Sequence, residues 1–198
     1  MLSVQQVEQM FSRYGGVMRT GQLSAERVYY PELQQLLSAG ILEKLRTGCY
    51  RVAGQPMNEM QTVMSLFPDA VLCGETALHY YGYITAKPFE WNLAVSKDSG
   101  KSRFRLDYPF VKPYYIEPSL VEIGSDLIET ADGTARIYDR ERVICDCLRY
   151  RNKMERSVFS QALKNYIADP QKNLPRLFEY ATQLRVAKTA RETLGLWL

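Results

Sequence analysis

The sequence predicts an α+β protein in which a short helical segment ending in a hairpin precedes a second, larger part. Two observations support this prediction. Apolar residues recur at helical spacing near both ends of the chain, whereas short runs of strand-forming residues between turn signals fill the middle. The 198 residues, 46% of them hydrophobic and 24% charged, suffice for one or two packed cores.

Composition argues against several classes of protein. No run of about 18 uncharged apolar residues occurs, and the opening "MLSVQQVEQMFSR" is amphipathic, so we expect a cytoplasmic protein with no membrane partner. The four cysteines show no C-x-x-C spacing and the chain has one histidine, which argues against a zinc site or a disulfide framework. We therefore expect no metal and no cofactor.

Charge is unevenly distributed along the chain. The net charge is +3, but residues 1–55 carry +2, residues 56–150 carry −4 and residues 151–198 carry +5. This distribution predicts two functional surfaces rather than one uniform shell.

The N-terminal segment is expected to form three helices. The first is marked by apolar residues three and four positions apart and ends at Tyr14–Gly16; these apolar residues are Val4, Val7, Met10 and Phe11. Val17 and Met18 then fit a short strand, and Thr20 fits the N-cap of a brief second helix. The third helix has Pro31 in its first turn, an inner stripe of leucines and Gly40 at its C-terminus.

A hairpin is expected directly after the third helix, in "GILEKLRTGCYRVAG". Thr47–Gly48 is its turn, because Gly48 supplies the positive φ that a short hairpin connection commonly needs. Strand alternation places Lys44 and Arg46 on one side of the first strand.

Three helices followed by a basic hairpin predict a winged helix-turn-helix over residues 1–54. In that arrangement the third helix enters the major groove and the hairpin, or wing, touches the DNA backbone. Lysine and arginine suit the wing because phosphate contacts supply most non-specific affinity, and glutamine suits the helix because its amide pairs with an adenine edge. A helical subdomain whose hairpin serves only protein contacts is the alternative.

The rest of the chain, residues 58–198, is expected to form a C-terminal domain with a small mixed sheet and a helical bundle, joined by a linker within Gly54–Met60. A helix around Asn58–Phe67 opens it. Strands are expected at "AVLCG", at "EWNLAVS", over Val111–Pro118 and over Leu120–Tyr138 with an Asp132–Gly133 turn, and a short helix at "ETALHYYG". Four helices are expected after Asp139, the second closed by Asp169–Pro170 and the last including Trp197.

One stretch resembles an enzyme. "CGETALHYYGYITAKPFEWNLAVS" is similar to the opening of nucleotidyltransferase folds, in which a strand offers two carboxylates to metal. Here that strand reads Glu90-Trp91-Asn92-Leu93, one acid and one amide, so we expect a scaffold with no catalytic residues. The rival interpretation, a divergent nucleotidyltransferase, would use Glu75 or Glu90 with a metal ion.

Four segments in order resemble a known family. They are "GGVMRTGQL", "YYPELQQLLSAGILEKLRTGCYRV", "CGETALHYYG" and "YDRERVICDCLRYR". Together they resemble the AbiEi-type antitoxins, transcriptional regulators of type IV toxin-antitoxin systems in bacterial abortive phage infection. The resemblance covers nearly the whole chain.

The resemblance implies a DNA-binding autorepressor and antitoxin rather than an enzyme. Its winged helix would bind inverted repeats in its own promoter as a monomer or a cooperative pair, and its C-terminal domain would counter a nucleotidyltransferase-like toxin without a stable complex. The DNA-binding positions it implies are Thr20, Ser24, Arg27, Tyr30, Pro31, Gln34, Gln35, Lys44, Arg46 and Arg51. A stand-alone transcription factor or an interaction module without antitoxin activity is the alternative.

Overall fold

The computed structural model describes residues 2–56, 58–130 and 133–195 and divides the chain into two compact units. The first comprises Met1–Asp69, Arg105–Phe110 and Glu129–Ala135, and the second comprises Ala70–Phe104, Val111–Ile128 and Arg136–Leu198. Helices and two sheets make the protein mixed α and β, consistent with the α+β class. In the part of the chain that the structure describes, no helix has both the length and the apolarity to cross a membrane.

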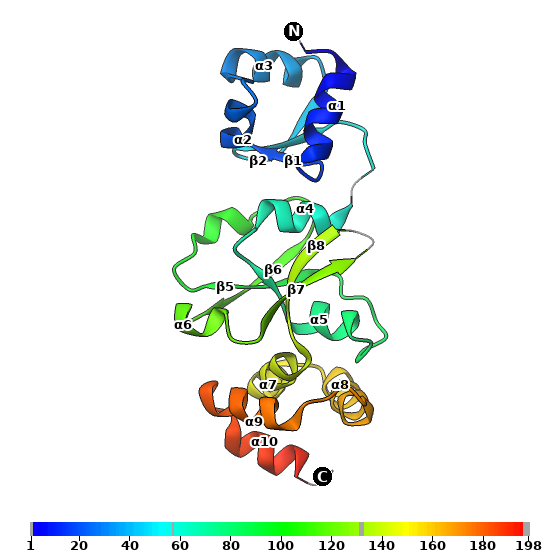
Figure 1. Cartoon of the computed structure of the whole chain (residues 1–198), viewed down its shortest axis with the longest axis vertical. Coiled ribbons are helices and arrows are strands. Elements are labelled where there is room, and N and C mark those ends of the chain that lie inside the picture. The colour runs from blue at the N-terminus through cyan, green and yellow to red at the C-terminus, as the bar shows by residue number, and fades with distance from the viewer. Residues whose placement is uncertain (1, 57, 131–132, 196–198) are drawn as a thin grey trace. The chain divides into compact units, whose positions relative to one another are not determined.

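The first unit opens with three helices and three strands (Figure 1). In chain order they are α1 (Val4–Arg13), β1 (Val17–Arg19), α2 (Thr20–Ala25), α3 (Tyr30–Ser38), β2 (Leu42–Arg46) and β3 (Cys49–Val52). The strands form an antiparallel sheet in the order β1-β3-β2, so the first strand lies beside the last.

Local chemistry sets the ends of these elements. Ser3 caps α1 in a reciprocal arrangement with Gln6, and positive φ angles at Gly15 and Gly16 let the chain turn into β1. The N-cap of α2 is Arg19 rather than the expected Thr20: the Arg19 N–H donates to Gln22 Oε1 at 2.8 Å. A glutamine side chain closes this helix start, so the helix needs no short polar residue as its N-cap.

A single apolar cluster holds these elements together. One face of α1, α2 and α3 packs on one face of the small sheet, as apolar spacing predicts. Its members are Val7, Met10, Phe11, Met18, Leu23, Val28, Leu33, Leu36, Leu42, Tyr50 and Val52.

A fourth helix, α4 (Glu59–Leu66), also belongs to the first unit. Asn58 caps it by accepting a hydrogen bond from the Gln61 N–H, and Met60, Val63 and Leu66 are buried. The boundary between the units falls between Asp69 and Ala70, so α4 groups with the residues before it. The division into domains at 1–54 and 58–198 stays a prediction.

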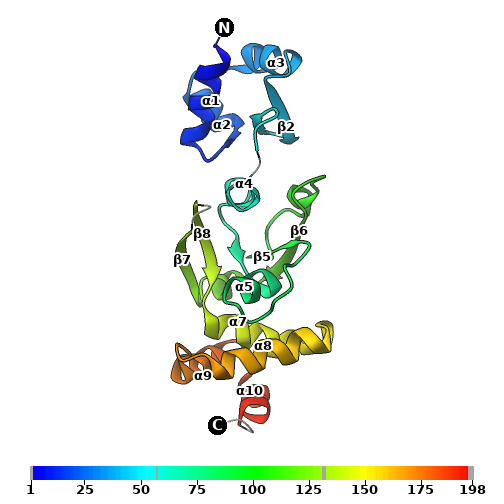
Figure 2. The same cartoon turned by 90° about the vertical axis from the view of Figure 1, so that its right-hand side faces the viewer.

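A five-stranded sheet in the order β6-β5-β4-β8-β7 forms the larger sheet of the protein (Figure 2). Its strands are β4 (Val71–Leu72), β5 (Trp91–Ser96), β6 (Val111–Ile116), β7 (Ser125–Thr130) and β8 (Gly133–Tyr138). Since β4 is antiparallel to β5 but parallel to β8, and β5 is parallel to β6, the sheet is mixed.

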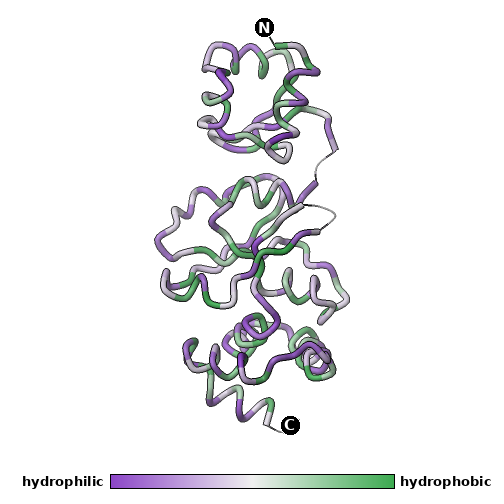
Figure 3. The backbone as a smooth tube through the Cα atoms, viewed as in Figure 1, coloured by the Kyte–Doolittle hydropathy of each residue, from purple (hydrophilic) through white to green (hydrophobic). Residues whose placement is uncertain are grey.

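The second unit contains the remaining helices. They are α5 (Gly74–Tyr80), η1 (Lys101–Phe104), α6 (Pro118–Val121), α7 (Arg140–Tyr150), η2 (Arg151–Lys153), α8 (Arg156–Ala168), α9 (Leu174–Gln183) and α10 (Ala187–Leu194). Every residue from Glu141 to Leu148 of α7 is buried, since α5, α8, α9 and α10 all contact this helix. Figure 3 shows hydrophilic and hydrophobic residues alternating along the helices, as expected when each buries one side.

The C-terminal elements agree with the sequence with one exception. Asp139 caps α7 by accepting from the Arg142 N–H, as predicted, and three more helices follow. The strand expected over Leu120–Tyr138 begins only at Ser125, because Pro118 favours the first turn of the short helix α6. Asp132 of the predicted turn and Trp197 of the last predicted helix lie outside the described residues.

Candidate nucleic-acid interface

Helix α3 exposes a polar face opposite its buried leucines. Tyr30 is 73% exposed, and Pro31, Gln34 and Gln35 are exposed as well. Leu33 and Leu36 point the other way, into the apolar cluster. We call the four exposed residues the α3 face. The structure therefore brings four of the expected DNA-binding positions onto one side of one helix.

The turn between α2 and α3 presents Arg27. Its φ of 65° lies in the left-handed region, and the Val28 N–H bonds back to the Leu23 carbonyl at 2.9 Å, which closes the C-terminus of α2. The Arg27 side chain is exposed. Ser24, one turn earlier in α2, is exposed too, and its carbonyl accepts from the Arg27 N–H.

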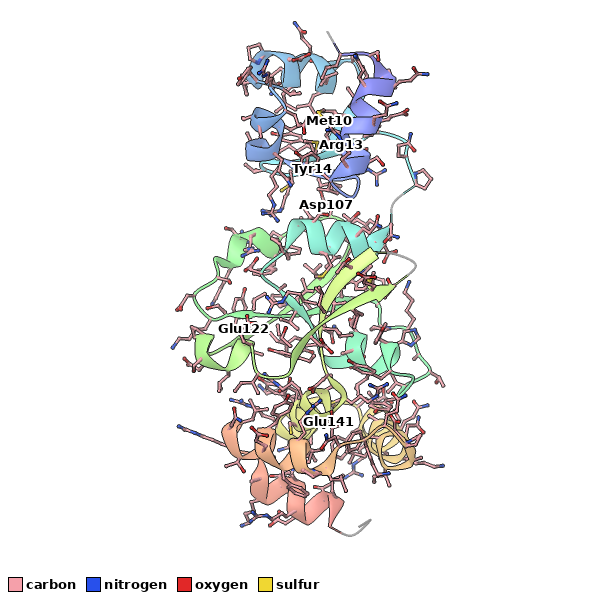
Figure 4. The ribbon with its side chains drawn as sticks, in the orientation of Figure 1. Met10, Arg13, Tyr14, Asp107, Glu122 and Glu141 are labelled. Atoms are coloured by element: carbon pink, nitrogen blue, oxygen red, sulfur yellow. The ribbon has the colours of Figure 1, made fainter. Side chains whose placement is uncertain are left out.

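Glu26 fixes this turn against the end of α1. Arg13 Nη2 and the Tyr14 hydroxyl both donate to the Glu26 carboxylate at 2.9 Å; Figure 4 labels Arg13 and Tyr14 near the end of α1. The hydrogen bond to Glu26 raises the pKa of Tyr14. Arg13 is thus paired with Glu26 at the surface, although most of its side chain stays exposed.

The hairpin β2–β3 does not place Lys44 and Arg46 on one side, contrary to the sequence-based prediction. Lys44 lies opposite Tyr50, but a register shift follows and Arg46 lies opposite Cys49. Directly opposed residues share a face, and Tyr50 and Cys49 are neighbours on opposite faces. The bulge at Leu45 therefore separates the two cations, a change that strict alternation cannot anticipate.

Arg46 and Arg51 are engaged within the first unit. Arg46 Nη2 donates to the Leu66 carbonyl at 3.0 Å, and its guanidinium lies 5.6 Å from the centroid of the Phe67 ring. Arg51 forms a 2.5 Å ion pair with Glu43, and its Nη2 donates to the Gln55 carbonyl at 2.8 Å. Only 12% of the Arg51 side chain is exposed.

Thr20 ties the hairpin turn to the start of α2. Its N–H donates to the Gly48 carbonyl at 3.0 Å, and its hydroxyl lies 3.4 Å from the same oxygen. Gly48 has a φ of 76°, as the turn prediction requires. The tip of the hairpin is consequently anchored next to the helix that precedes α3.

The positive charge of this surface is modest. Among the described residues, Arg27 and Lys44 are exposed and form no ion pair, whereas Arg13 and Arg51 are paired with acids. Helix α3 itself carries Glu32 and no lysine or arginine. The arrangement can hydrogen-bond base edges through two amides and can neutralise few phosphates.

The segment resembling a nucleotidyltransferase uses Asn92 structurally. Asn92 is buried; its Oδ1 accepts from the Glu75 N–H at 3.1 Å and its Nδ2 donates to the Glu90 carbonyl at 3.1 Å. An ionised carboxylate at this position could accept the first of these hydrogen bonds but could not donate the second. Within the described residues, no group of three or more His, Cys, Asp or Glu side chains is arranged to hold a metal ion.

Sequence reasoning missed two residues of the first unit that bear on the interface. Tyr29, the N-cap residue of α3, is 61% exposed beside Tyr30. Arg19 lies opposite Cys49 in the sheet and donates from Nη2 to the Ser65 carbonyl at 2.5 Å. The paired tyrosines can be read from the sequence. The contact between Arg19 and Ser65 cannot, because a linker expected within Gly54–Met60 separates Ser65 from the expected winged helix.

The chain was also compared with known proteins. No protein-family model matches it, and no curated protein matches it either.

Proposed function

We propose that the first unit is a winged helix that binds double-stranded DNA, with α3 in the major groove and β2–β3 as the wing. One observation carries the proposal: the order α1-β1-α2-α3-β2-β3 with sheet order β1-β3-β2 leaves the polar α3 face uncovered by the rest of the unit. A third helix presented in this way is the arrangement that reads a groove in helix-turn-helix proteins.

The chemistry of the α3 face supports base contacts. Gln34 and Gln35 are both exposed, and glutamine pairs in bidentate fashion with adenine. Tyr29 and Tyr30 add hydroxyl donors at the start of the helix, the end from which a recognition helix contacts bases. On the α2–α3 turn and the hairpin, Arg27 and Lys44 are the cations available for phosphate.

The small number of free cations favours binding by more than one copy. Each phosphate contact contributes to affinity through counterion release, so two such contacts give weak non-specific binding. Two copies on inverted repeats double the number of contacts. We therefore propose that the protein binds inverted repeats upstream of its own gene cooperatively.

The full function that we propose is that of an autorepressor and antitoxin of a type IV system, without enzymatic activity. The antitoxin role rests on the resemblance of the sequence to AbiEi-type antitoxins. The structural use of Asn92 supports a non-catalytic second unit, because the position that a second carboxylate would need is occupied by a residue tying α5 to β5.

Footprinting on the DNA upstream of the gene tests the regulatory half. The expected result is protection of two inverted half-sites separated by whole helical turns. For the antitoxin half, the chain is co-expressed with a nucleotidyltransferase-like toxin, and growth is measured. Wild type and Lys44→Ala should both restore growth, whereas only wild type should repress the promoter fully; loss of both activities in the variant would contradict two separable functions.

A further inference from the structure

The small sheet of the first unit has a second face, turned away from the apolar cluster, that carries three arginines. The register places Arg19 and Arg46 on either side of Cys49, one on each neighbouring strand, and Arg51 two residues further along β3. Strict alternation along β2 would place Arg46 on the opposite face. The bulge at Leu45 is what brings the guanidinium of Arg46 to this side.

Two of these arginines bind the C-terminal end of α4. Arg19 Nη2 donates to the Ser65 carbonyl at 2.5 Å, and Arg46 Nη2 donates to the Leu66 carbonyl at 3.0 Å. The last carbonyls of a helix lack partners within the helix, and a cation is favourable there. We call these two contacts the arginine clasp.

Each of the two arginines is half-buried, and part of its guanidinium group is shielded from solvent. The Nε atoms of Arg19 and Arg46 are buried without a hydrogen-bond partner in the described structure, and Arg46 lies over the Phe67 ring. A buried unpaired donor costs free energy, so side chains intended only for phosphate contact would be better placed in solvent. Lys44, on the other face of the same strand, is exposed.

We propose that Arg19 and Arg46 are positioning residues, which fix the wing against α4, and that α4 is therefore an integral part of the DNA-binding unit. Phosphate is then contacted by Lys44 on the wing and by Arg27, and not by Arg46. This inference rests on the proposed DNA-binding function, and it removes Arg46 from the phosphate contacts that the resemblance implies.

The test compares full-length Arg46→Ala and Arg19→Ala with the matched control Lys44→Ala. The dissociation constant is measured on the upstream DNA over a series of salt concentrations, and amide hydrogen exchange of residues 42–52 is measured without DNA. Lys44→Ala should lower the slope of log K against log salt by about 0.9, the value for one phosphate on duplex DNA, and leave exchange unchanged.

Both arginine variants should behave differently from the control. Binding weakens with the salt slope unchanged, and amides of residues 42–52 exchange roughly threefold to tenfold faster, the change expected when one hydrogen bond that holds the hairpin is lost. A slope loss in Arg46→Ala equal to that of Lys44→Ala overturns the inference. So does unchanged exchange in both arginine variants.

The two readouts separate this inference from the proposed function. If the wild-type protein shows no salt-sensitive binding to DNA, the proposed function is wrong. The exchange measurement then still decides whether the arginines hold the hairpin: faster exchange in both variants supports the clasp, and unchanged exchange refutes it.

Discussion

Gln34 is the residue from which sequence-specific binding is best tested. Its side chain is exposed on the α3 face, and its carbonyl accepts from the Ser38 hydroxyl, a bond that leaves the amide group available. Gln34→Ala should cost about 1–3 kcal/mol at one base position of the operator if the contact is bidentate. Competition titrations with single-base operator variants measure this loss, and an equal loss on random DNA would refute the contact.

Arg27 combines an exposed charge with a backbone conformation that favours glycine. At φ 65° a side chain with a Cβ is strained by roughly 1–2 kcal/mol, so Arg27→Gly should leave stability unchanged or raise it by up to about 1 kcal/mol. The same change should weaken DNA binding and lower the salt slope by about 0.9, because one phosphate contact is lost.

Arg185 is the control for that substitution. It has a φ of 58°, is exposed, and lies in the turn between α9 and α10 of the second unit. Arg185→Gly should have a similar effect on stability and no effect on DNA binding. Equal losses of affinity in both variants would indicate that net charge, and not the position of Arg27, determines binding.

At the scale of elements, α7 depends on one buried ion pair. Arg142 is fully buried; its Nε donates to Asp146 Oδ2 at 3.2 Å, and its Nη1 donates to the carbonyls of Leu120 and Ile123 at 2.7 and 2.6 Å. Asp146→Ala leaves this guanidinium charge unpaired in the interior and should destabilise the protein by about 3–5 kcal/mol. Urea unfolding followed by circular dichroism measures the loss; a change under 1 kcal/mol would show that the carbonyls alone satisfy Arg142.

Asp169 should make stability depend on pH. Partial burial acts to raise its pKa, but hydrogen bonds from the Tyr83 hydroxyl at 2.6 Å and from the Gln171 N–H, together with Arg140, lower it below the usual value. Because the folded pKa is depressed, the stabilisation is complete above the unfolded pKa of about 3.9 and is lost as pH falls through the folded pKa. Unfolding of wild type and Asp169→Asn between pH 2 and 7 should show a stability difference that disappears at the acid end. A constant difference would contradict the assignment.

The elements that the sequence predicts well are those specified by local signals. Helix faces follow from apolar spacing, Asp139 caps α7 as expected, and Gly40 and Gly48 adopt the positive φ angles that their turns require. Pro31, Gln34 and Gln35 are exposed opposite the inner stripe of leucines, as the same periodicity requires. These features depend on residues close in sequence, which is why a single sequence reveals them.

Two kinds of feature were not predicted from the sequence. The binding of Arg19 and Arg46 to α4 depends on where a segment distant in sequence lies. The bulge at Leu45 and the cap of α2 through Gln22 are local, but neither strict alternation nor the usual preference for a short polar N-cap predicts them. Alternation alone placed Lys44 and Arg46 together. A register shift of one residue moves a side chain to the other face of a sheet, so this part of the candidate site could not be read from the pattern.

The chain divides into two compact units, each held by contacts within itself. This division fits the two activities that we propose, DNA binding and antitoxicity, being separable. The first unit contains the α3 face and the hairpin, and the second contains α7 and the helices packed around it. The excess of basic residues over residues 151–198 belongs to the second unit, whereas the candidate interface belongs to the first. A variant that impairs DNA binding through the first unit should therefore leave the second unit folded.

A gel-shift titration tests the central claim that the first unit binds specific DNA. The full-length protein is titrated onto the DNA upstream of its gene at two salt concentrations, with an unrelated fragment as competitor. We expect retardation that survives the competitor, increases cooperatively with protein concentration and weakens at the higher salt. Absence of a shift at low salt, or equal competition by the unrelated fragment, would contradict it.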